Sequence, residues 1–535
     1  MKLESLYIKE YRVLKELKID FGRGNNSALN PQSGYTLDFL VGVNGTGKTT
    51  VLQFLGRLLV ALYEQDTFPI PFELIYTLTG LEKGNERKIT VTNIPSETNA
   101  DQGDVTDIGS DRFYFREGEG KLQRGRLPNT LLPELVVVYT TGSEREWLAA
   151  LQPTSIPQSD ETEPERQPDQ PSVEQPGHRP NLAIFSNEDA PNPTNVLFIQ
   201  SYHSSLVALC GLLAAEQSSQ LRRNENAAVQ SVLNPVLEAL RLELLGGFSL
   251  RIRSHPNLTP PYQQEILDTI CACADSTLTQ GADQLLIFDM TRQIEKFHNG
   301  EGQKSLLQLY NSPITLFRNL YRLYEHRPFY APPLQEVNLF FKRTIGKRSD
   351  TTTDELETSG TDTTLQLFDW LSDGERSFLA RMALFALFRA HDLLILLDEP
   401  EVHFNDVWKR EIVSTLDQIM QGQASHALIT THSSITLTDV PSKDVIVLQR
   451  VAGATTGADV VSDRKFQTFG ADPSDIMVHV FGTQTANGEH SHRFIRREIG
   501  NRNTVRELDE LAAIVAPGYW RYRIQLEKTR VEQAH

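Results

Sequence analysis

Cysteine is scarce in this chain of 535 residues: only Cys210, Cys271 and Cys273 occur, and they form no C-x-x-C pair. This odd set excludes a disulfide scaffold and a paired zinc knuckle, and it is typical of reduced thiols in a cytoplasmic protein. Uninterrupted apolar runs of about eighteen residues are also absent, so we expect no membrane-spanning helix and no membrane partner. The N-terminal stretch MKLESLYIKEYRVLKELKIDF has neither the apolar core nor the cleavage site of a secretory signal. We expect it to belong to the mature protein.

Positive charge is scarce as well. The 52 Lys and Arg residues stand against 69 Asp and Glu, which gives a formal net charge of −17 at pH 7. A surface this acidic does not coat nucleic acid as a whole, although a local basic patch is compatible with it. The apolar share of 39% and the charged share of 23% are ordinary for globular proteins and exclude a collagen-like or fully disordered chain.

The pattern of apolar residues predicts an α/β fold with an insertion. Alternation predicts a β-hairpin at the N-terminus, then a strand over 36–43 and an amphipathic helix that begins at Lys48. The run LVVVY is apolar on every position, as in strands covered on both faces of a sheet. We found no internal repeat.

These patterns divide the chain into five segments. Prolines among Gln, Glu, Asp and Ser predict a disordered acidic loop between two segments of denser apolar content. The five predicted segments are an N-terminal half of a nucleotide-binding head (1–150), the acidic Pro-rich loop (151–194), a helical insertion (195–330), the C-terminal half of the head (331–484) and a helical, locally basic region (485–535).

Residues 42–49 fit the pattern G-x-x-x-x-G-K-[ST] at every fixed position. Glycines let the backbone wrap around phosphate oxygens so that successive N–H groups point inward, and the following helix adds its positive N-terminus. Lys48 supplies an ammonium group to the terminal phosphates, and Thr49 supplies a hydroxyl to Mg²⁺. The predicted nucleotide-binding residues are Gly42, Val43, Asn44, Gly45, Thr46, Gly47, Lys48, Thr49 and Thr50.

Two acids end another fully apolar strand, in the sequence LLILLDEPE. Asp398 and Glu399 at the carboxyl end of a sheet strand are costly unless they face a cation or a reacting water. Because side chains alternate along a strand, one carboxylate can face Mg²⁺ while the other faces water beside the γ-phosphate. The pair predicts catalytic residues when it is combined with the phosphate loop.

Two further features are open to a structural and a functional interpretation. In LSDGERS, the residues Ser372, Asp373, Gly374 and Glu375 precede a helix and can present donors to an anion. Ser372 and Glu375 can equally form a capping box. His432 follows the strand HALITT; its place after the acid pair favours a γ-phosphate contact over a role in the core.

These four motifs, in this order, resemble those of the ATP-binding-cassette (ABC) ATPases, over residues 1 to about 150 and 330 to about 440. The resemblance implies an α/β ABC ATPase head, with a mixed central sheet around the phosphate loop and an antiparallel β-subdomain. It assigns Walker A to 42–50, the signature to 372–375, the Walker B magnesium carboxylate to Asp398, the catalytic glutamate to Glu399 and the switch histidine to His432. It implies ATP and Mg²⁺ as cofactors. It also implies a homodimer in which the signature of one subunit closes on the nucleotide of the other.

Two positions depart from the family pattern. Asn405 occupies the place of the D-loop aspartate. The Q-loop glutamine has no clear counterpart, since Thr140, Thr141 and Ser143 follow one suitable strand and Gln200 follows another.

The N-terminal hairpin with Arg12, the split motif halves and the short insertion resemble the structural-maintenance, double-strand-repair and RecF branch of the family. That resemblance makes Arg12 a candidate nucleotide contact. Asp472 and Asp475 form an acidic pair after His432, and we expect it in a turn rather than after an apolar strand, which argues against a nuclease centre in this chain.

The tail sequences QTFGADPSDIMVHVFGT and LDELAAIVAPGYWRYRIQ are similar to those of the PtuA ATPases of Septu and Septu-containing retron anti-phage systems. This resemblance implies an ATP-switched defence ATPase that controls a separate HNH nuclease (PtuB-like). In retron versions a reverse transcriptase and its branched DNA are also partners. The alternatives are a RecF-like repair ATPase that acts directly on DNA and a nucleotide-sensing scaffold; Glu399 speaks against the scaffold.

Overall fold

We describe a computed structural model of the chain. It describes residues 1–21, 35–79, 86–94, 113–142, 144–151, 195–223, 231–253, 259–299, 304–309, 312–324, 332–344, 363–388, 392–421, 425–450, 457–461, 466–483 and 488–534. The acidic segment expected over 151–194 lies outside these ranges apart from its first residue, as does Ser143. The chain divides into two units, Met1–Phe469 and Gly470–His535. None of the described helices is long and apolar enough to cross a membrane.

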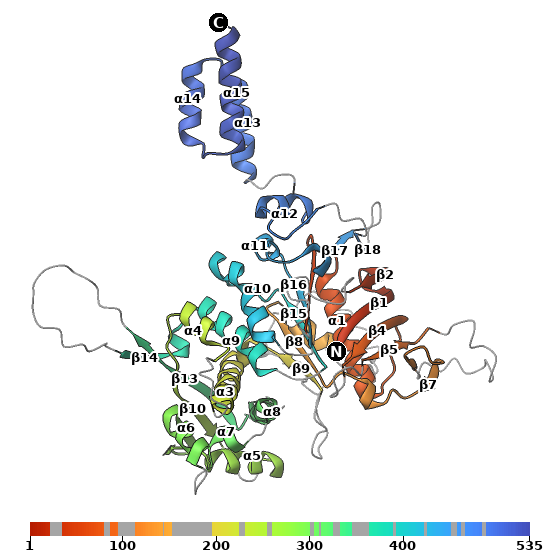
Figure 1. The fold of residues 1–535 in the computed structure, drawn as a ribbon, viewed down its shortest axis with the longest axis vertical. Coiled ribbons are helices and arrows are strands. Elements are labelled where there is room, and N and C mark those ends of the chain that lie inside the picture. Colours follow the sequence, from red (N-terminus) through yellow and green to blue (C-terminus); the bar gives the residue numbers. More distant parts are fainter. Residues whose placement is uncertain are drawn as a thin grey trace, which may run out of the picture. The chain divides into compact units, whose positions relative to one another are not determined.

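A seven-stranded sheet forms the centre of the first unit (Figure 1). Its strand order is β18-β17-β3-β16-β15-β8-β9, and every neighbouring pair is parallel except β17 and β18. The strands are β3 (Thr36–Gly42), β8 (Leu135–Thr140), β9 (Val196–Ile199), β15 (Leu393–Asp398), β16 (Ser425–Thr430), β17 (Val445–Arg450) and β18 (Ala458–Val460). Every residue of β8, β15 and β16 is buried, as the apolar runs of β8 and β15 predicted. Because carboxyl ends of parallel strands share one edge, residues that follow β3, β8, β15 and β16 meet there.

A six-stranded antiparallel sheet lies on the other side of helix α1 (Lys48–Glu64) and has the strand order β2-β1-β4-β5-β6-β7. The strands are β1 (Lys2–Tyr11), β2 (Leu14–Asp20), β4 (Phe72–Leu78), β5 (Arg87–Thr92), β6 (Phe113–Glu117) and β7 (Gln123–Gly125). One hydrophobic core joins Ile8 of β1, Leu55 of α1 and Leu396 of β15. A sheet thus covers α1 on either side. For this reason the apolar residues of the helix are not confined to one face.

The insertion is not wholly helical, so this prediction is wrong for part of 195–330. A third, antiparallel sheet has the order β11-β12-β10-β13-β14, with β10 (Leu245–Arg253), β11 (Ser276–Gln280), β12 (Asp283–Asp289), β13 (Leu334–Thr344) and β14 (Thr363–Leu367). The helices around it are α3 (Ser204–Arg223), α4 (Asn234–Ala239), α5 (Pro261–Cys271), α6 (Met290–Asn299), α7 (Leu306–Leu309) and α8 (Pro313–Tyr324). The alternation in FSLRIR and the apolar run in QLLIFD are short and lie between helical patterns, so the sequence does not predict these strands.

Helix α9 (Asp373–Leu387) carries the proposed signature and is packed on several sides. It contacts α3 and α10 (Asp406–Met420), and all of its residues from Phe378 to its end are buried. Its first turn remains accessible, so the motif at its N-terminus can meet another molecule. The remaining elements of this unit are α2 (Glu144–Leu151), α11 (Ser434–Leu437) and the 3-10 helices η2 (Asn129–Leu131), η4 (Ser201–His203), η5 (Phe368–Trp370) and η6 (Ser442–Asp444).

The second unit consists of α12 (Pro473–His479), α13 (Glu489–Asn501), α14 (Val505–Ile514) and α15 (Tyr519–Ala534). Its small core is formed by Ile495, Leu508, Leu511 and Ile524. Asp472, expected in a turn, is the N-cap of α12, because its side chain accepts a hydrogen bond from the Ser474 N–H (2.8 Å). Asp475 lies in the first turn of that helix, where its negative charge complements the positive helix N-terminus.

Candidate nucleotide-binding and catalytic site

The phosphate loop joins the end of β3 to α1. Gly42 has φ +151°, and a Cβ there would lie 2.3 Å from the carbonyl oxygen of Leu448 in β17. Gly47, the N-cap of α1, has φ +90°, and a Cβ there would lie 2.5 Å from Leu14 of the N-terminal hairpin. Both positions require glycine, so neighbouring strands hold the loop in its curved form.

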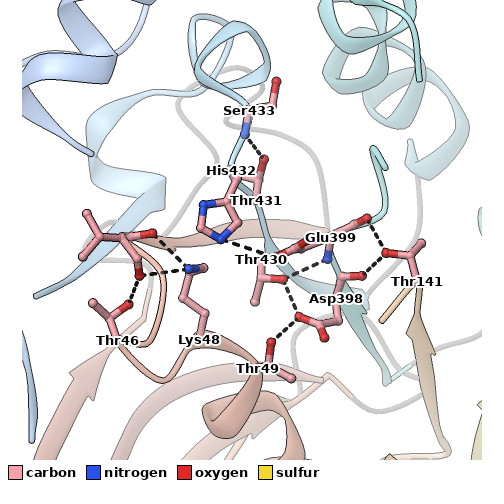
Figure 2. A network of polar contacts seen from close by, with 12 residues as sticks. Thr46, Lys48, Thr49, Thr141, Asp398, Glu399, Thr430, Thr431, His432 and Ser433 are labelled. Atoms are coloured by element: carbon pink, nitrogen blue, oxygen red, sulfur yellow. Dashed lines mark hydrogen bonds and ion pairs between the residues drawn. The ribbon is translucent and has the colours of Figure 1, made fainter. Parts of the chain in front are cut away.

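Lys48 lies inside this loop and is 6% exposed. Its Nζ donates hydrogen bonds to the carbonyl oxygens of Gly42 (2.9 Å) and Val43 (3.3 Å). Burial lowers the pKa of the ammonium group, and the carboxylates of Glu399 and Asp398 oppose that shift. Figure 2 shows the ammonium between the loop and His432, where the terminal phosphates of a nucleotide would lie.

Asp398 ends β15 and accepts four hydrogen bonds. Its Oδ1 accepts from Thr49 Oγ1 (2.9 Å) and Thr430 Oγ1 (2.8 Å), and its Oδ2 accepts from Trp147 Nε1 (3.3 Å) and Thr140 Oγ1 (3.4 Å). Sequence reasoning missed Trp147; the available signal was that the indole N–H of a buried tryptophan usually has a hydrogen-bond acceptor. The structure therefore brings the two predicted magnesium ligands, Thr49 and Asp398, into direct contact.

These two ligands fit Mg²⁺, which binds few protein oxygens and keeps phosphate and water ligands. Among the residues that the structure describes, no group of three or more His, Cys, Asp and Glu could hold a metal. A divalent cation at Thr49 and Asp398 would therefore depend on a bound nucleotide for its other ligands.

Glu399 lies next to this pair in a strained backbone conformation, with φ +49°. Its N–H donates to Thr430 Oγ1 (2.9 Å), and its carbonyl oxygen accepts from Thr141 Oγ1 (3.1 Å). Burial, followed by the charges of Asp398 and Glu401, raises the pKa of the Glu399 carboxyl. A carboxylate of raised basicity in a fixed position is suited to accept a proton from water.

His432 forms the opposite wall, with its Nε2 3.3 Å from Glu399 Oε1 (Figure 2). Burial and the neighbouring charge of Lys48 lower the pKa of the imidazole, so it is neutral at pH 7 and can donate one hydrogen bond. Glu401, which sequence reasoning also missed, fixes the turn: it accepts hydrogen bonds from the His432 N–H (3.1 Å) and Thr431 Oγ1 (2.5 Å). Burial raises the pKa of Glu401.

The signature residues form the capping box that was the structural alternative. Glu375 Oε2 accepts from the Ser372 N–H (2.8 Å), and Ser372 Oγ accepts from the Glu375 N–H (3.3 Å). Asp373 pairs with Arg376 on the surface, and a Cβ on Gly374 would lie 2.8 Å from the carbonyl oxygen of His403. Among the described residues, no hydrogen bond joins Ser372 to the phosphate loop or to the acid pair.

Arg12 lies at the turn between β1 and β2, with φ +53°. Its guanidinium donates to Gln53 of α1 and lies 5.3 Å from the centre of the Tyr11 ring. These contacts attach the hairpin to α1, while the next residues of the turn, Val13 and Leu14, lie against Gly47. A nucleotide contact by Arg12 stays a prediction.

The two candidate Q-loop strands take different positions. β8 is the neighbour of β15, and Thr140 and Thr141 at its end contact Asp398 and Glu399. Gln200 follows β9, one strand further from the acid pair, and its amide donates to Glu144 (3.2 Å). Of the Q-loop candidates, Thr140 and Thr141 therefore contact the acid pair directly, whereas Gln200 contacts Glu144.

A cleft of about 490 Å³ separates the end of β8 from the first turns of α9 and is lined by Thr141, Ser201, Arg376, Arg381 and His403. Arg381 is 3% exposed and donates to Tyr139 Oη (3.0 Å) and to the carbonyl oxygens of Pro400 and Val402. It thus ties α9 to the segment that follows Glu399. Asn405, at the D-loop position, is the N-cap of α10 and accepts from the Trp408 N–H (2.9 Å).

A phosphate loop between β3 and α1, an acid pair after β15 and a histidine after β16 meet at one edge of a mixed sheet, beside an antiparallel β-subdomain. This arrangement has the fold of an ABC-type ATPase head. The fold class predicted from the sequence is confirmed.

Residues 282–439 match the family model AAA_21, which is described as "AAA domain, putative AbiEii toxin, Type IV TA system". The match spans less than half of the chain and includes α9, the acid pair and His432 but not the phosphate loop. No curated protein matches the chain.

Similar solved structures are heads of structural-maintenance proteins. The head domain from Thermotoga maritima is 11% identical with a TM-score of 0.31, covering 87% of this chain and 100% of its own. A head bound to the C-terminal winged-helix domain of ScpA is 12% identical with a TM-score of 0.31, covering 86% of this chain and 98% of its own. A Pyrococcus furiosus head, bound to the C-terminal domain of ScpA, is 11% identical with a TM-score of 0.30, covering 86% and 96%. Because these values are low, the class rests on the sheet order and the site.

Proposed function

We propose that the chain binds ATP with Mg²⁺ and hydrolyses it. The observation that carries the proposal is the joint placement of a ligand pair, Thr49 and Asp398, with a basic carboxylate, Glu399, at the edge where the phosphate loop ends. Lys48 and the loop N–H groups bind the phosphates. Mg²⁺ held by Thr49 and Asp398 would neutralise charge that develops on them.

Glu399 then accepts the proton of the attacking water as general base. The Nε2 of neutral His432 lies 3.3 Å from Glu399 Oε1, and its single N–H would donate either to this carboxylate or, once nucleotide is bound, to the γ-phosphate. The strained backbone at Glu399, fixed by Thr430 and Thr141, keeps the carboxylate on the nucleotide side of β15.

Two variants test this proposal. Lys48→Ala is expected to lose ATP affinity, whereas Glu399→Gln is expected to bind ATP and lose hydrolysis by about a hundredfold or more. Both are measured as ATP binding and phosphate release by the full chain, with Arg251→Gln as a control, since Arg251 is half-exposed in the third sheet and pairs with Glu336. Hydrolysis by Glu399→Gln at the unaltered rate removes the general-base assignment.

The functional unit we propose is a homodimer, in which Ser372 to Glu375 of one copy close on the nucleotide of the other. Large apolar side chains near the signature support a contact there: Trp370 is 68% exposed, and Val407, at 58%, lies beside Trp408, which packs near Gly374. The accessible first turn of α9 supports it as well.

In the cell, the proposed role is that of an ATP-dependent switch in anti-phage defence, which controls a partner HNH nuclease; a reverse transcriptase with its branched DNA is a further partner in a retron version. The tail resemblance and the acidic surface support it, and the family model's description names a toxin–antitoxin system. Co-purification with the products of the neighbouring genes tests it. Tight, steeply salt-dependent DNA binding without a nuclease would favour a repair ATPase instead.

A further inference from the structure

Strand β17 forms one wall of the phosphate loop. It runs parallel to β3 with Val447 opposite Val41 and Leu448 opposite Gly42. The same close approach makes Gly42 necessary, since a Cβ there would meet the Leu448 carbonyl oxygen. Continuing this register by two residues brings Arg450, the last residue of β17, level with Asn44 at the tip of the loop.

The side chain of Arg450 contacts that tip directly. Its Nη2 donates a hydrogen bond to the carbonyl oxygen of Asn44 (3.1 Å). Nη2 also lies 2.7 Å from where a Cβ on Gly45 would be, and Gly45 has φ +78°. A side chain at position 45 would therefore push the guanidinium away from its present position.

The planarity of the peptide bond turns this contact into a directional constraint. In a trans peptide, the carbonyl of Asn44 and the N–H of Gly45 point in opposite directions. When Arg450, outside the loop, holds the carbonyl, the Gly45 N–H is directed to the inner side, where a phosphate oxygen needs a donor. We propose that Arg450 is a positioning residue for nucleotide binding, which orients this N–H; this inference rests on the proposed ATP binding.

An arginine suits this task better than a lysine. Guanidinium has five N–H donors in a rigid plane, whereas the ammonium of a lysine is a mobile point charge. The Arg450 side chain is exposed, so its replacement leaves no buried group without a partner. Changes in binding can therefore be separated from changes in folding.

The test measures ATP and ADP affinity, kcat, KM and Tm for the full chain and for Arg450→Gln, Arg450→Lys and Arg251→Gln. Arg450→Gln is expected to weaken the binding of both nucleotides by about tenfold, as the loss of one charge-assisted hydrogen bond does. We expect KM to rise in parallel, with kcat at saturation within about twofold, since the chemistry at Glu399 is untouched. Arg450→Lys is expected to recover part of the affinity, and Arg251→Gln to match the unaltered chain.

Unchanged affinity in Arg450→Gln would overturn the inference while leaving the proposed function intact, provided that Lys48→Ala still loses ATP. A fall in Tm of several degrees, shared by Arg450→Gln and Arg450→Lys, would show a structural role and would also overturn it. Failure of the unaltered chain to bind ATP would overturn both.

Discussion

At the scale of single residues, the site holds ionisable groups whose pKa values are displaced toward their neutral forms. The pKa of Glu399 is raised while those of His432 and Lys48 are lowered, and in each case burial is the largest cause. The site is therefore poised around bound phosphate, whose charges would favour the charged forms of Lys48 and His432. Pairs of groups displaced in opposite directions are typical of acid–base centres.

The raised pKa of Glu399 predicts the acid limb of the pH–rate profile. A general base works only when ionised, so kcat/KM falls as pH decreases through the pKa of the free protein. That pKa lies above the ordinary value of 4.5. The pH at which kcat/KM has fallen to half of its maximum on the acid side is therefore expected to lie above 4.5. Steady-state hydrolysis measured across pH at constant free Mg²⁺ checks this; a limb centred at or below 4.5 contradicts it.

Glu401 predicts a dependence of stability on pH. Its pKa is raised in the folded chain, so between 4.5 and that higher value the folded state binds more protons than the unfolded state. Stability contributed by this group therefore falls as pH rises. Glu401→Gln keeps an oxygen acceptor for His432 but cannot ionise, so its Tm relative to the unaltered chain is expected to increase from pH 4.5 upward. A constant difference across this range, in parallel thermal melts, would argue against the shift.

At the scale of elements, local sequence patterns were sufficient to predict a helix or strand wherever a motif directly precedes or follows it in the sequence. The phosphate loop, β15 and β16 were predicted because each lies where a largely apolar strand ends in glycine or polar residues. Contacts outside the motifs, between residues distant in sequence, could not be predicted: Arg450 meets Asn44 across 406 positions, and Trp147 meets Asp398 across 251. Strands β10 and β12 could not be predicted because the alternation in β10 and the apolar run in β12 are too short to outweigh the helical patterns around them.

Arg381 is the element-scale link between α9 and the segment after Glu399. Arg381→Met keeps an apolar stem but leaves the carbonyl oxygens of Pro400 and Val402 without their donor, which costs roughly 2–4 kcal/mol of folding stability. The urea midpoint measures this loss. Arg376→Met on the same helix is the control: it removes a surface pair with Asp373 and is expected to cost about 0–1 kcal/mol. Equal midpoints for the two variants would show that the Arg381 contacts do not stabilise α9.

At the scale of the whole chain, charge is unevenly divided between the two units. From Gly470 onward the sequence has nine Lys or Arg and nine Asp or Glu, so the entire formal charge of −17 belongs to the first unit. Two copies that approach through their heads therefore repel each other, and bound nucleotide has to overcome this repulsion. Added salt screens it, with a Debye length of about 10 Å at 0.1 M.

We therefore expect Glu399→Gln to form a dimer with ATP and Mg²⁺, and moderate salt to strengthen the dimer rather than weaken it. Light scattering after size-exclusion chromatography measures the mass with and without ATP. Ser372→Arg should abolish the dimer, because its bulk occupies the face that meets the partner's nucleotide. Thr504→Arg is the matched control, since Thr504 and Glu507 form the same type of capping box but belong to the second unit and not to the predicted signature. Loss of the dimer in both variants would trace the effect to a broken cap, whereas retention in both would place the interface elsewhere.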